Sequence, residues 1–522
     1  MKRKLLVCSI LAALALPGAR SSAQDFRDAL RYSQQYPEGT ARSLAMGNAM
    51  VALGGDMGAL SVNPAASGVY RYSELVLTPS LTFTHTEADY LNTVSSAGRT
   101  RAGLSNIGYV GTFSTGRKNR GLINWNLAIA FNRNNSFTSR MTAAGRTAQS
   151  SWLSSLAQNT GGIHARSLDL NDYNDPYARN LPWNSVLGWN TSLLDTLPDS
   201  GSDYLAATEN LSGYNIIIGG DLDQRFSREA SGNISEAILN FGGNFSNKFF
   251  FGINIGVQSI WYKYDETYSE SAVNPSDFQS GFLHFTHRYH QRTSGTGINL
   301  KAGFIYLPVK GLRLGASIST PTWTYLYEEW EMRMSSAFSD GYSQSLTSPL
   351  GTYNYRVNTP FRWNAGAAYT FGSAGAVSVD YERVDYSRMK MIDPGDDFEF
   401  SSENQQIRNM FRASGILRIG AEVRVLPQLA IRAGYQLYSD SYREIPQDNQ
   451  TAQERKTNTS LGSLGLGYAS RKGFFADLAY QQYMKKNSET FSLYDDIVSQ
   501  PAPAGTAQTG CGKLLLSLGF RF

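Results

Sequence analysis

The sequence offers few groups of side chains that could carry out chemistry. Three of its five histidines fall close together in the segment HFTHRYH, as His284, His287 and His290. Imidazole nitrogens can ligate zinc or haem iron. On an extended strand, however, His284 and His290 share one face and His287 takes the other, so a site using all three needs a bend. The spacing favours a polar aromatic rim near a membrane interface, without metal or cofactor, over the alternative of haem capture.

Motifs of the common enzyme classes are absent. The sequence has no G-x-S-x-G, H-E-x-x-H, P-loop or C-x-x-C pattern, so we expect no catalytic residues and no enzyme such as a lipase or acyltransferase. The formal net charge of +4 is slight for 522 residues and gives no electrostatic support for nucleic-acid binding.

The first residues indicate export. A short basic start precedes the apolar run Leu5–Leu16 and the small residues before Gln24, which together predict a signal peptide over residues 1–23. Removal of Cys8 with this peptide leaves Cys511 as the remaining cysteine, so no intramolecular disulfide is expected. After this peptide, no run of 18 apolar residues predicts a membrane-spanning helix.

The elements that position these side chains are strands. In KLLLSLGFRF, at the end of the chain, alternate positions from Leu514 to Phe522 are apolar, a two-residue period. The same period recurs in segments of roughly 11 to 23 residues, long enough to cross a membrane when tilted. Fourteen such segments are predicted: 74–86, 103–114, 121–132, 234–245, 249–264, 285–307, 312–327, 353–370, 376–391, 409–425, 429–442, 459–470, 473–485 and 512–522.

The connections between these segments alternate between short turns and long loops, as at the two rims of an outer-membrane barrel. We therefore predict an all-β fold, a 14-stranded antiparallel transmembrane β-barrel over residues 74–522. The even number of strands is what closure of an antiparallel bacterial barrel requires.

If the apolar positions face lipid, the alternate positions line the interior and carry many charges. Barrel interiors are normally polar, so one interpretation is a charge network that stiffens the wall. The other is that Lys301, Arg313 or Arg362 binds the anionic head group of a ligand.

The longest predicted loop covers residues 133–232, and loops of such length are often functional. The segment RTAQSSWLSSLAQN within it predicts a short amphipathic helix. Trp152, Leu156, Trp183 and Trp189 are candidates for capturing an apolar substrate at the cell exterior, although they could equally pack the loop against itself.

The stretch GGDMGALSVNPAASG, residues 54–68, precedes the first strand and is too rich in small residues for a strand of its own. Glycine and alanine permit tight folding inside a cylinder, and Asn63 can bond to its own turn while Pro64 fixes the entry. We predict that residues 24–73 form a plug, or hatch, within the barrel, anchored by Asn63, Pro64 and Ala65.

The segment GTARSLAMGNAMVALGGDMGALSVNPAASGVY with its Asn63-Pro64-Ala65 motif, and the segment LKAGFIYLPVKGLRLGASISTPT, resemble the FadL/TodX family of outer-membrane transporters, in particular its Bacteroidetes branch. The resemblance implies a plugged barrel in the bacterial outer membrane that takes up long-chain fatty acid-like or aromatic compounds. In the family, substrates are captured outside and leave sideways through a gap in the wall. Because glycines weaken the second strand, such a gap is expected near Gly103–Gly111.

The resemblance also implies surrounding membrane lipid and lipopolysaccharide, and assembly by barrel-assembly machinery through the C-terminal strand, as partners. Two other functions remain compatible with a barrel: a general porin, which needs an open lumen, and an adhesive or structural barrel with working loops.

Overall fold

A computed structural model describes residues 25–171, 179–198, 200–213, 215–395, 399–443, 458–484, 487–497 and 501–522. The predicted signal peptide, residues 1–23, lies outside the described residues. In the described part of the chain, no helix is long and apolar enough to span a membrane.

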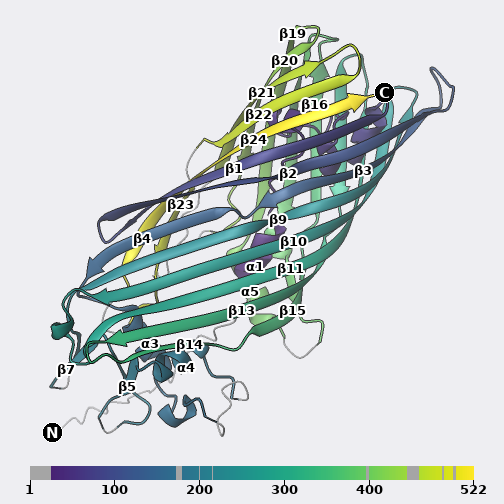
Figure 1. The fold of residues 1–522 in the computed structure, drawn as a ribbon. Helices are drawn as coiled ribbons and strands as arrows, with labels where there is room; N and C mark the ends of the chain where they lie inside the picture. Colours follow the sequence, from purple (N-terminus) through teal and green to yellow (C-terminus); the bar gives the residue numbers. More distant parts are fainter. Residues whose placement is uncertain are drawn as a thin grey trace, which may run out of the picture.

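Twenty labelled strands form one antiparallel sheet that closes on itself, because β24 pairs with β22 on one side and with β1 on the other (Figure 1). Several strands are successive pieces of one bent crossing, and we call each complete crossing a stave. The wall then has fourteen staves, which confirms the predicted fold class. Staves one to seven are β1 (Glu74–Tyr90), β2 (Thr93–Ser114), β3 (Leu122–Ser136) with β4 (Ser139–Thr147), β9 (Leu222–Phe245), β10 (Phe249–Ala272), β11 (Phe282–Tyr306), and β12 (Leu312–Ser319) with β13 (Trp323–Phe338). Staves eight to fourteen are β14 (Ser343–Thr347) with β15 (Gly351–Asn358) and β16 (Arg362–Thr370), β17 (Gly375–Asp385) with β18 (Lys390–Ile392), β19 (Ala413–Leu426), β20 (Leu429–Tyr438), β21 (Thr459–Ala469), β22 (Phe474–Tyr483) with β23 (Asn487–Ser492), and β24 (Ala504–Arg521).

The outer surface of the staves is apolar, as the alternation predicts. Ile129, Ile253 and Leu464 are more than half exposed, and on β24 the alternate residues Leu516 and Leu518 face outward while Ser517 is buried. A closed barrel leaves no unpaired strand edge in lipid, and its apolar band matches the hydrocarbon layer.

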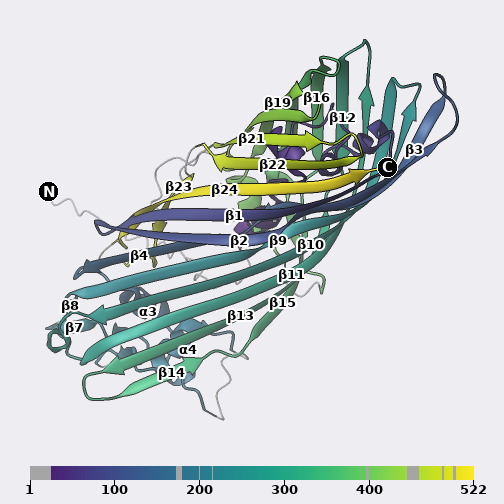
Figure 2. The same ribbon diagram turned by 45° about the horizontal axis from the view of Figure 1, so that its top comes forward.

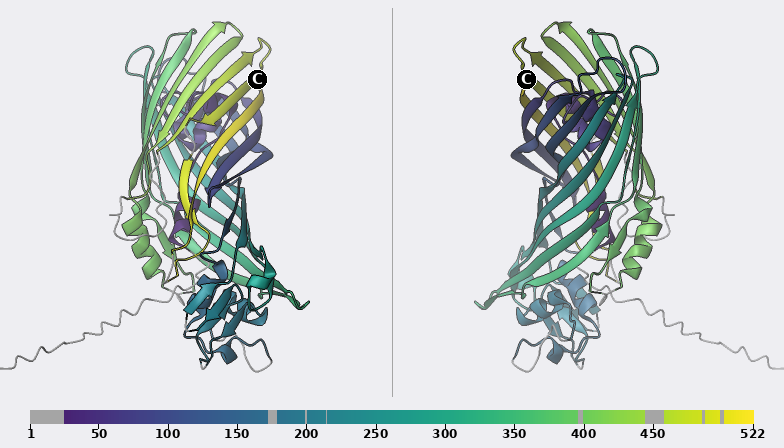
Figure 3. Two further views of the ribbon diagram at one scale, coloured as in Figure 1. Left: turned by 90° about the vertical axis from the view of Figure 1, so that its left-hand side faces the viewer. Right: turned by 90° about the vertical axis from the view of Figure 1, so that its right-hand side faces the viewer.

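The wall is uneven in height. Staves such as β10 and β11, of 24 and 25 residues, extend far toward the long-loop end, whereas β19 and β20 have 14 and 10 residues (Figures 1 and 2). On the short side, α5 (Ser401–Met410) and the one-turn helix η5 (Tyr386–Arg388) continue the wall (Figure 3).

The long loop after the third stave is shorter than the predicted range 133–232. The third stave continues through β4 to Thr147 and the fourth begins at Leu222, so the loop proper covers residues 148–221. Alternation did not reveal these extensions because segments such as SRMTAAGRT carry few apolar side chains. The loop holds α3 (Trp152–Thr160), which confirms the predicted helix, η3 (Ala165–Ser167), α4 (Trp183–Asn190), and two small hairpins, β5 (Leu194–Thr196) with β6 (Tyr204–Ala206) and β7 (Glu209–Ser212) with β8 (Asn215–Ile218). A further turn, η4 (Pro275–Asp277), lies in the loop after β10.

Residues 25–73 lie inside the barrel, where the hatch is expected, and most of them are buried. They contain α1 (Phe26–Ser33), α2 (Ala41–Ala45), η1 (Gly58–Ser61) and η2 (Pro64–Val69). The three elements after α1 lie near the short-turn end, while α1 reaches halfway along the lumen (Figures 1 and 3).

Glycines of the wall let the hatch backbone touch the staves. Gly420 and Gly434 are cross-strand partners, and a Cβ on either would collide with the main chain of Met46 or Gly47. A second group consists of Gly242, Gly252 and Gly303, which lie side by side under Asn63 and η2, and a third of Gly315 and Gly366 under Val51. We call these groups the glycine contacts; they are flat areas onto which an irregular chain can settle.

Gly420→Ala and Gly434→Ala should therefore displace the hatch. Main chain must move to accept the added methyl group, at a cost of about 1–3 kcal/mol each. We expect both variants to show frequent channel openings in planar bilayers while the native protein stays closed. Gly98→Ala is the matched control, because a Cβ there meets only ordinary contacts with β1. Closed Gly420→Ala and Gly434→Ala channels would contradict this role.

Candidate functional site

The hatch has little regular structure, so many of its carbonyls need hydrogen-bond donors from elsewhere. Side chains on the inner wall donate to them. Each such donor sits at an inward position of a stave and reaches at least one hatch carbonyl. The pairs are Asn124 with Tyr70, Asn126 with Ser67, Asn132 with Met57, Asn240 with Pro64, Asn254 with Leu60, and Ser317 with Val62. The wall thus recognises the hatch backbone position by position.

Asn63 of the predicted motif connects three parts of the molecule. Its side chain is fully buried; Oδ1 accepts from Ala65 N at 3.0 Å, and Nδ2 donates to Val51 O at 2.7 Å and Phe304 O at 3.1 Å. Pro64 is the first residue of η2. The motif therefore begins a helical turn, holds a second hatch segment and attaches both to β11.

The three predicted lumen cations all contact the hatch. Lys301 Nζ donates to Ser61 O at 3.0 Å, and Arg313 Nη1 donates to Leu53 O at 2.6 Å. Arg362 Nη2 donates to Ser33 O at 2.5 Å. The head-group role expected for these residues stays a prediction, since their charged atoms already bind the plug.

Two of these cations are also paired with buried carboxylates, in line with the charge-network interpretation. Lys301 lies 2.7 Å from Glu236, and Glu382 joins Arg362 and Arg418 at 2.6 Å each. A second chain, Asp477–Arg432–Glu422–Arg42, links the wall to the hatch with separations of 2.5, 2.7 and 3.0 Å. Buried pairs of this kind seldom add net stability, but breaking one leaves an uncompensated charge, so they fix geometry.

The pairing between the second and third staves ends partway. β2 and β3 pair from Ser114↔Asn124 to Asn106↔Asn132, and the preceding part of β2 pairs with β1 alone. At the same level β2 has a register shift at Ser105, opposite the step Thr78/Pro79. This bulge falls within the glycine-rich range in which a gap was expected. We call the unpaired boundary beyond Asn106 the seam.

A hatch segment takes the place of β2 beside β3 at the seam. Tyr36 N donates to Asn134 O at 2.7 Å and Glu38 N to Arg133 O at 3.0 Å. The Asn135 side chain completes this short ladder by donating to Gln34 O at 3.2 Å. Residues 34–38 therefore act as a surrogate strand that satisfies backbone groups left free where the staves part.

The Glu38 side chain contacts three of the strands that meet at the seam. Its fully buried carboxylate accepts from Ser105 Oγ at 2.5 Å and lies 3.0 Å from Lys513 Nζ and 3.5 Å from Arg133 Nη1. Burial raises the pKa of Glu38, but the two cations and the Ser105 hydroxyl outweigh it and hold the pKa below its usual value. Glu38 is thus ionised and connects β2, β3 and β24. Gly103 leaves room for the Arg133 guanidinium, which a Cβ there would strike.

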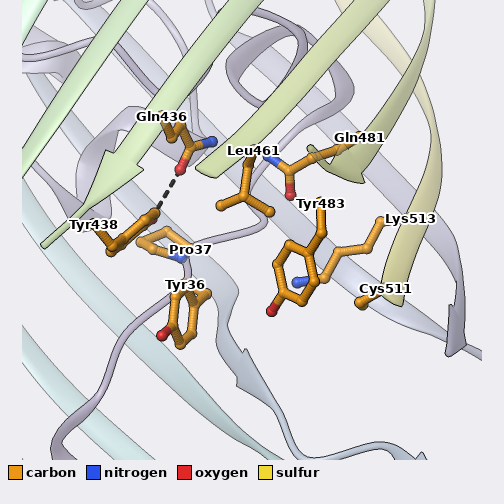
Figure 4. A pocket seen from close by; sticks show the side chains of 9 residues that line it. All are labelled: Tyr36, Pro37, Gln436, Tyr438, Leu461, Gln481, Tyr483, Cys511 and Lys513. Carbon is orange, nitrogen blue, oxygen red and sulfur yellow. Dashed lines mark hydrogen bonds between the residues drawn. The ribbon is translucent and has the colours of Figure 1, made fainter. Parts of the chain in front are cut away.

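The other side of the surrogate strand faces β20–β24. Figure 4 shows Tyr36 and Pro37 opposite Tyr438, Tyr483 and Lys513. The rings of Tyr36 and Tyr438 are 4.8 Å apart, and Tyr438 donates to Gln436. The space left between these side chains is about 10 Å³, room for about one water molecule. The segment is therefore closely packed on both sides.

Beyond this segment the lumen widens on the long-loop side. A cavity of about 420 Å³ is bordered by Leu30, Gln34, Ser139 and Arg228, next to the seam. Deeper, α1 sits in a largely apolar chamber where Phe26 lies 5.7 Å from Phe411. The other buried members of this chamber include Tyr262, Tyr355, Val357, Tyr386, Met389, Met391, Phe400 and Ile407. The chamber is thus mostly aromatic and aliphatic, with the buried Glu328 carboxylate hydrogen-bonded to Tyr355 at 3.2 Å, and α1 fills it.

The loop residues predicted to capture substrate pack in an apolar cluster that the loop shares with the staves, and the rings nearest Trp152 are Tyr268 of β10 and Phe285 and His287 of β11. Leu156 is buried, and Trp152, Trp183 and Trp189 are half-buried against the same apolar cluster. Their capture role stays a prediction. A groove of about 440 Å³ that sequence reasoning did not identify lies nearby, bordered by Leu205, Phe338 and Tyr342 together with polar groups.

The three histidines are dispersed. His284 is exposed, His287 is buried beside Trp152 and 3.1 Å from Asn184 Oδ1, and His290 lies 2.7 Å from Asp265. No group of three or more His, Cys, Asp or Glu side chains among the described residues is placed to hold a metal ion.

Asn63→Ala should loosen the hatch. It removes three hydrogen bonds and leaves the carbonyls of Val51 and Phe304 without this donor, a cost of about 2–5 kcal/mol in total. We expect faster trypsin cleavage within residues 25–73 and intermittent conductance in planar bilayers. Asn354→Ala, at an exposed position of β15, is the control. Unaltered cleavage and conductance in Asn63→Ala would show that the motif is not an anchor.

Comparison with known proteins shows which proteins share this fold. No family model matches the chain. Outer membrane protein P5 of Haemophilus influenzae is 31% identical over 129 residues, 24% of this chain, and the chain spans about a third (33%) of that relative's length. The Pseudomonas putida toluene transporter TodX is similar in structure at a TM-score of 0.51 and 14% identity, covering 94% of this chain and 99% of TodX. A Pseudomonas aeruginosa FadL homologue gives 0.53 and 12%, covering 94% and 100%. At these identities the likeness shows the fold: the chain is an outer-membrane β-barrel with the fold of FadL-type transporters.

Proposed function

We propose that the protein takes up hydrophobic small molecules, fatty acid-like or aromatic, through the outer membrane. A substrate captured among the extracellular loops enters the lumen, reaches the chamber that α1 fills, and leaves sideways through the seam into the membrane. The observation that carries the proposal is the seam itself, where β2 leaves β3 and residues 34–38 stand in its place.

Three further features support this proposal. The chamber around α1 is apolar and aromatic, which suits such a substrate better than a polar solute. The hatch fills the lumen near the short-turn end, which a general porin would leave open. A structural neighbour of the same fold is a toluene transporter, which favours transport over catalysis.

The seam also gives a physical route for apolar molecules. An apolar molecule gains little by entering the aqueous periplasm, whereas moving it into the hydrocarbon layer is favourable by about 25 cal/mol per Å² of apolar surface. Exit through the wall therefore needs no energy source other than the gradient. Withdrawal of residues 34–38 from β3 would open the way, so hatch movement and exit are the same event.

Expression in a deletion strain tests the function. The native protein should restore uptake of a labelled long-chain fatty acid or labelled toluene by at least about tenfold over the empty vector. An equal rate with and without the protein for both substrates would exclude uptake of these classes and favour an adhesive or structural barrel.

Gly103→Phe tests the route. The ring would compete with Arg133 for the space at the seam, so uptake should fall by about tenfold although the barrel still assembles. Assembly is checked by the slower migration of unheated protein in electrophoresis. Gly111→Phe lies on the part of the same strand that is paired with β3, where a side chain would meet Tyr109 and Phe113, and it should transport normally. Equal uptake by the two variants would rule out exit at this place.

A further inference from the structure

The short-turn, periplasmic end of the lumen carries a concentration of arginines below the hatch. Two adjoining cavities, of about 210 and 400 Å³, open there and share Arg42, Glu422 and Arg424 in their walls. Six arginines line the pair of cavities: Arg42, Arg313, Arg424, Arg432, Arg471 and Arg521. Only two carboxylates, Glu422 and Asp477, line them as well. We call the two cavities together the arginine basin.

The carboxylates of the basin are already used. Glu422 is shared by Arg42 and Arg432, and Asp477 binds Arg432 at 2.5 Å. Arg521 is paired outside the basin lining with Glu74, at 2.8 Å. The chain's own acids therefore neutralise only part of the positive charge.

Three arginines of the basin, Arg313, Arg424 and Arg471, have no carboxylate within ion-pair distance among the described residues. Arg313 donates through Nη1 to Leu53 O, while its Nε is buried without a hydrogen-bond partner. Arg424 is exposed, and its side chain makes no hydrogen bond or ion pair with another described residue. Arg313 and Arg424 border the smaller cavity, which the hatch residues 53–55 also line.

The surplus of positive charge in the basin suits an oxyanion as a ligand. Guanidinium groups bind carboxylate and phosphate oxygens through paired hydrogen bonds, and a partly enclosed site strengthens the attraction relative to water. The lining also offers apolar surface, since Val69 and Tyr72 border the smaller cavity beside the arginines. The basin can thus accept a charged head group with a short apolar continuation.

We propose that the arginine basin is a binding site for an oxyanion, the phosphate or carboxylate head of an amphiphile or a free anion of the same chemistry. A bound anion would touch Arg313 and Arg424 on the wall and lie against Leu53–Gly55, so its binding adds a link between hatch and barrel. Binding to the native state alone raises stability in proportion to the logarithm of anion concentration. The proposal goes beyond transport and depends on the charges of the basin alone.

Calorimetric titration of the full-length protein in an uncharged detergent tests the site. The probes are inorganic phosphate, dodecyl phosphate and sodium decanoate, with dodecanol as the uncharged comparison. We expect at least one anion to bind while dodecanol does not, and the affinity to fall as salt is raised. Equal affinity for inorganic phosphate and dodecyl phosphate identifies a free-anion site. Binding of dodecyl phosphate or decanoate but not inorganic phosphate identifies a head-group site.

Variants assign the binding to the basin. Arg424→Gln and Arg313→Gln should each lower the affinity for the anion by about tenfold, the usual effect of losing one charge-assisted hydrogen bond. Because Arg313 also holds Leu53, Arg424→Gln, which touches no hatch carbonyl, is the decisive variant. Arg117→Gln, in an exposed turn at the same end, is the control. Absence of binding by every anion, unchanged affinity in Arg424→Gln, or equal loss in Arg117→Gln would overturn the proposal, and uptake measurements would remain unaffected by that result.

Discussion

The structure depends on one constraint: an irregular chain inside a membrane barrel must still satisfy its backbone hydrogen bonds. Residues 25–73 have only two short α-helices, so their carbonyls cannot all be paired locally. The inner wall supplies the donors from asparagines such as Asn126 and Asn254 and from the cations Lys301 and Arg313. The polar interior is therefore a complementary surface for one particular path of the hatch.

This constraint explains why glycines and charges alternate on the inner wall. Where the wall donates through a side chain, the hatch stands off by the length of that side chain. Where the hatch backbone itself meets the wall, as at Gly252 and Gly420, any Cβ would occupy the same space. Buried ion pairs such as Glu382 with Arg418 fill the space that remains inside the wall. Because either charge would be costly to bury without its partner, these pairs favour a single arrangement.

The barrel and part of the site could be predicted from the sequence. Two-residue alternation predicted the staves because lipid demands an apolar outer face, but it failed beyond the membrane, where β4 and the start of β9 need no such face. The role of Lys301, Arg313 and Arg362 could not be read from the sequence, since a cation that binds a ligand and one that binds a carbonyl look alike. The glycine contacts left a signal, inward-facing glycines such as Gly242, Gly252 and Gly303, but their alignment depends on register across three staves. The surrogate strand left no signal in the sequence. Residues 34–38 can pair with β3 only because the β2–β3 ladder stops at Asn106, and the sequence does not show where that ladder stops.

That pairing also limits how the molecule can move. The hydrogen bonds from Tyr36 and Glu38 to β3 are the ones that close the seam, and the Glu38 carboxylate joins the same residues to β2 and β24. The seam therefore cannot open while residues 34–38 stay in place, and these residues cannot leave without exposing an ionised carboxylate and three carbonyl or hydroxyl partners. Such a step is favourable only when something else fills the space and solvates those groups. On the proposed route, the seam would therefore stay closed in the empty barrel and open only when a substrate replaces residues 34–38.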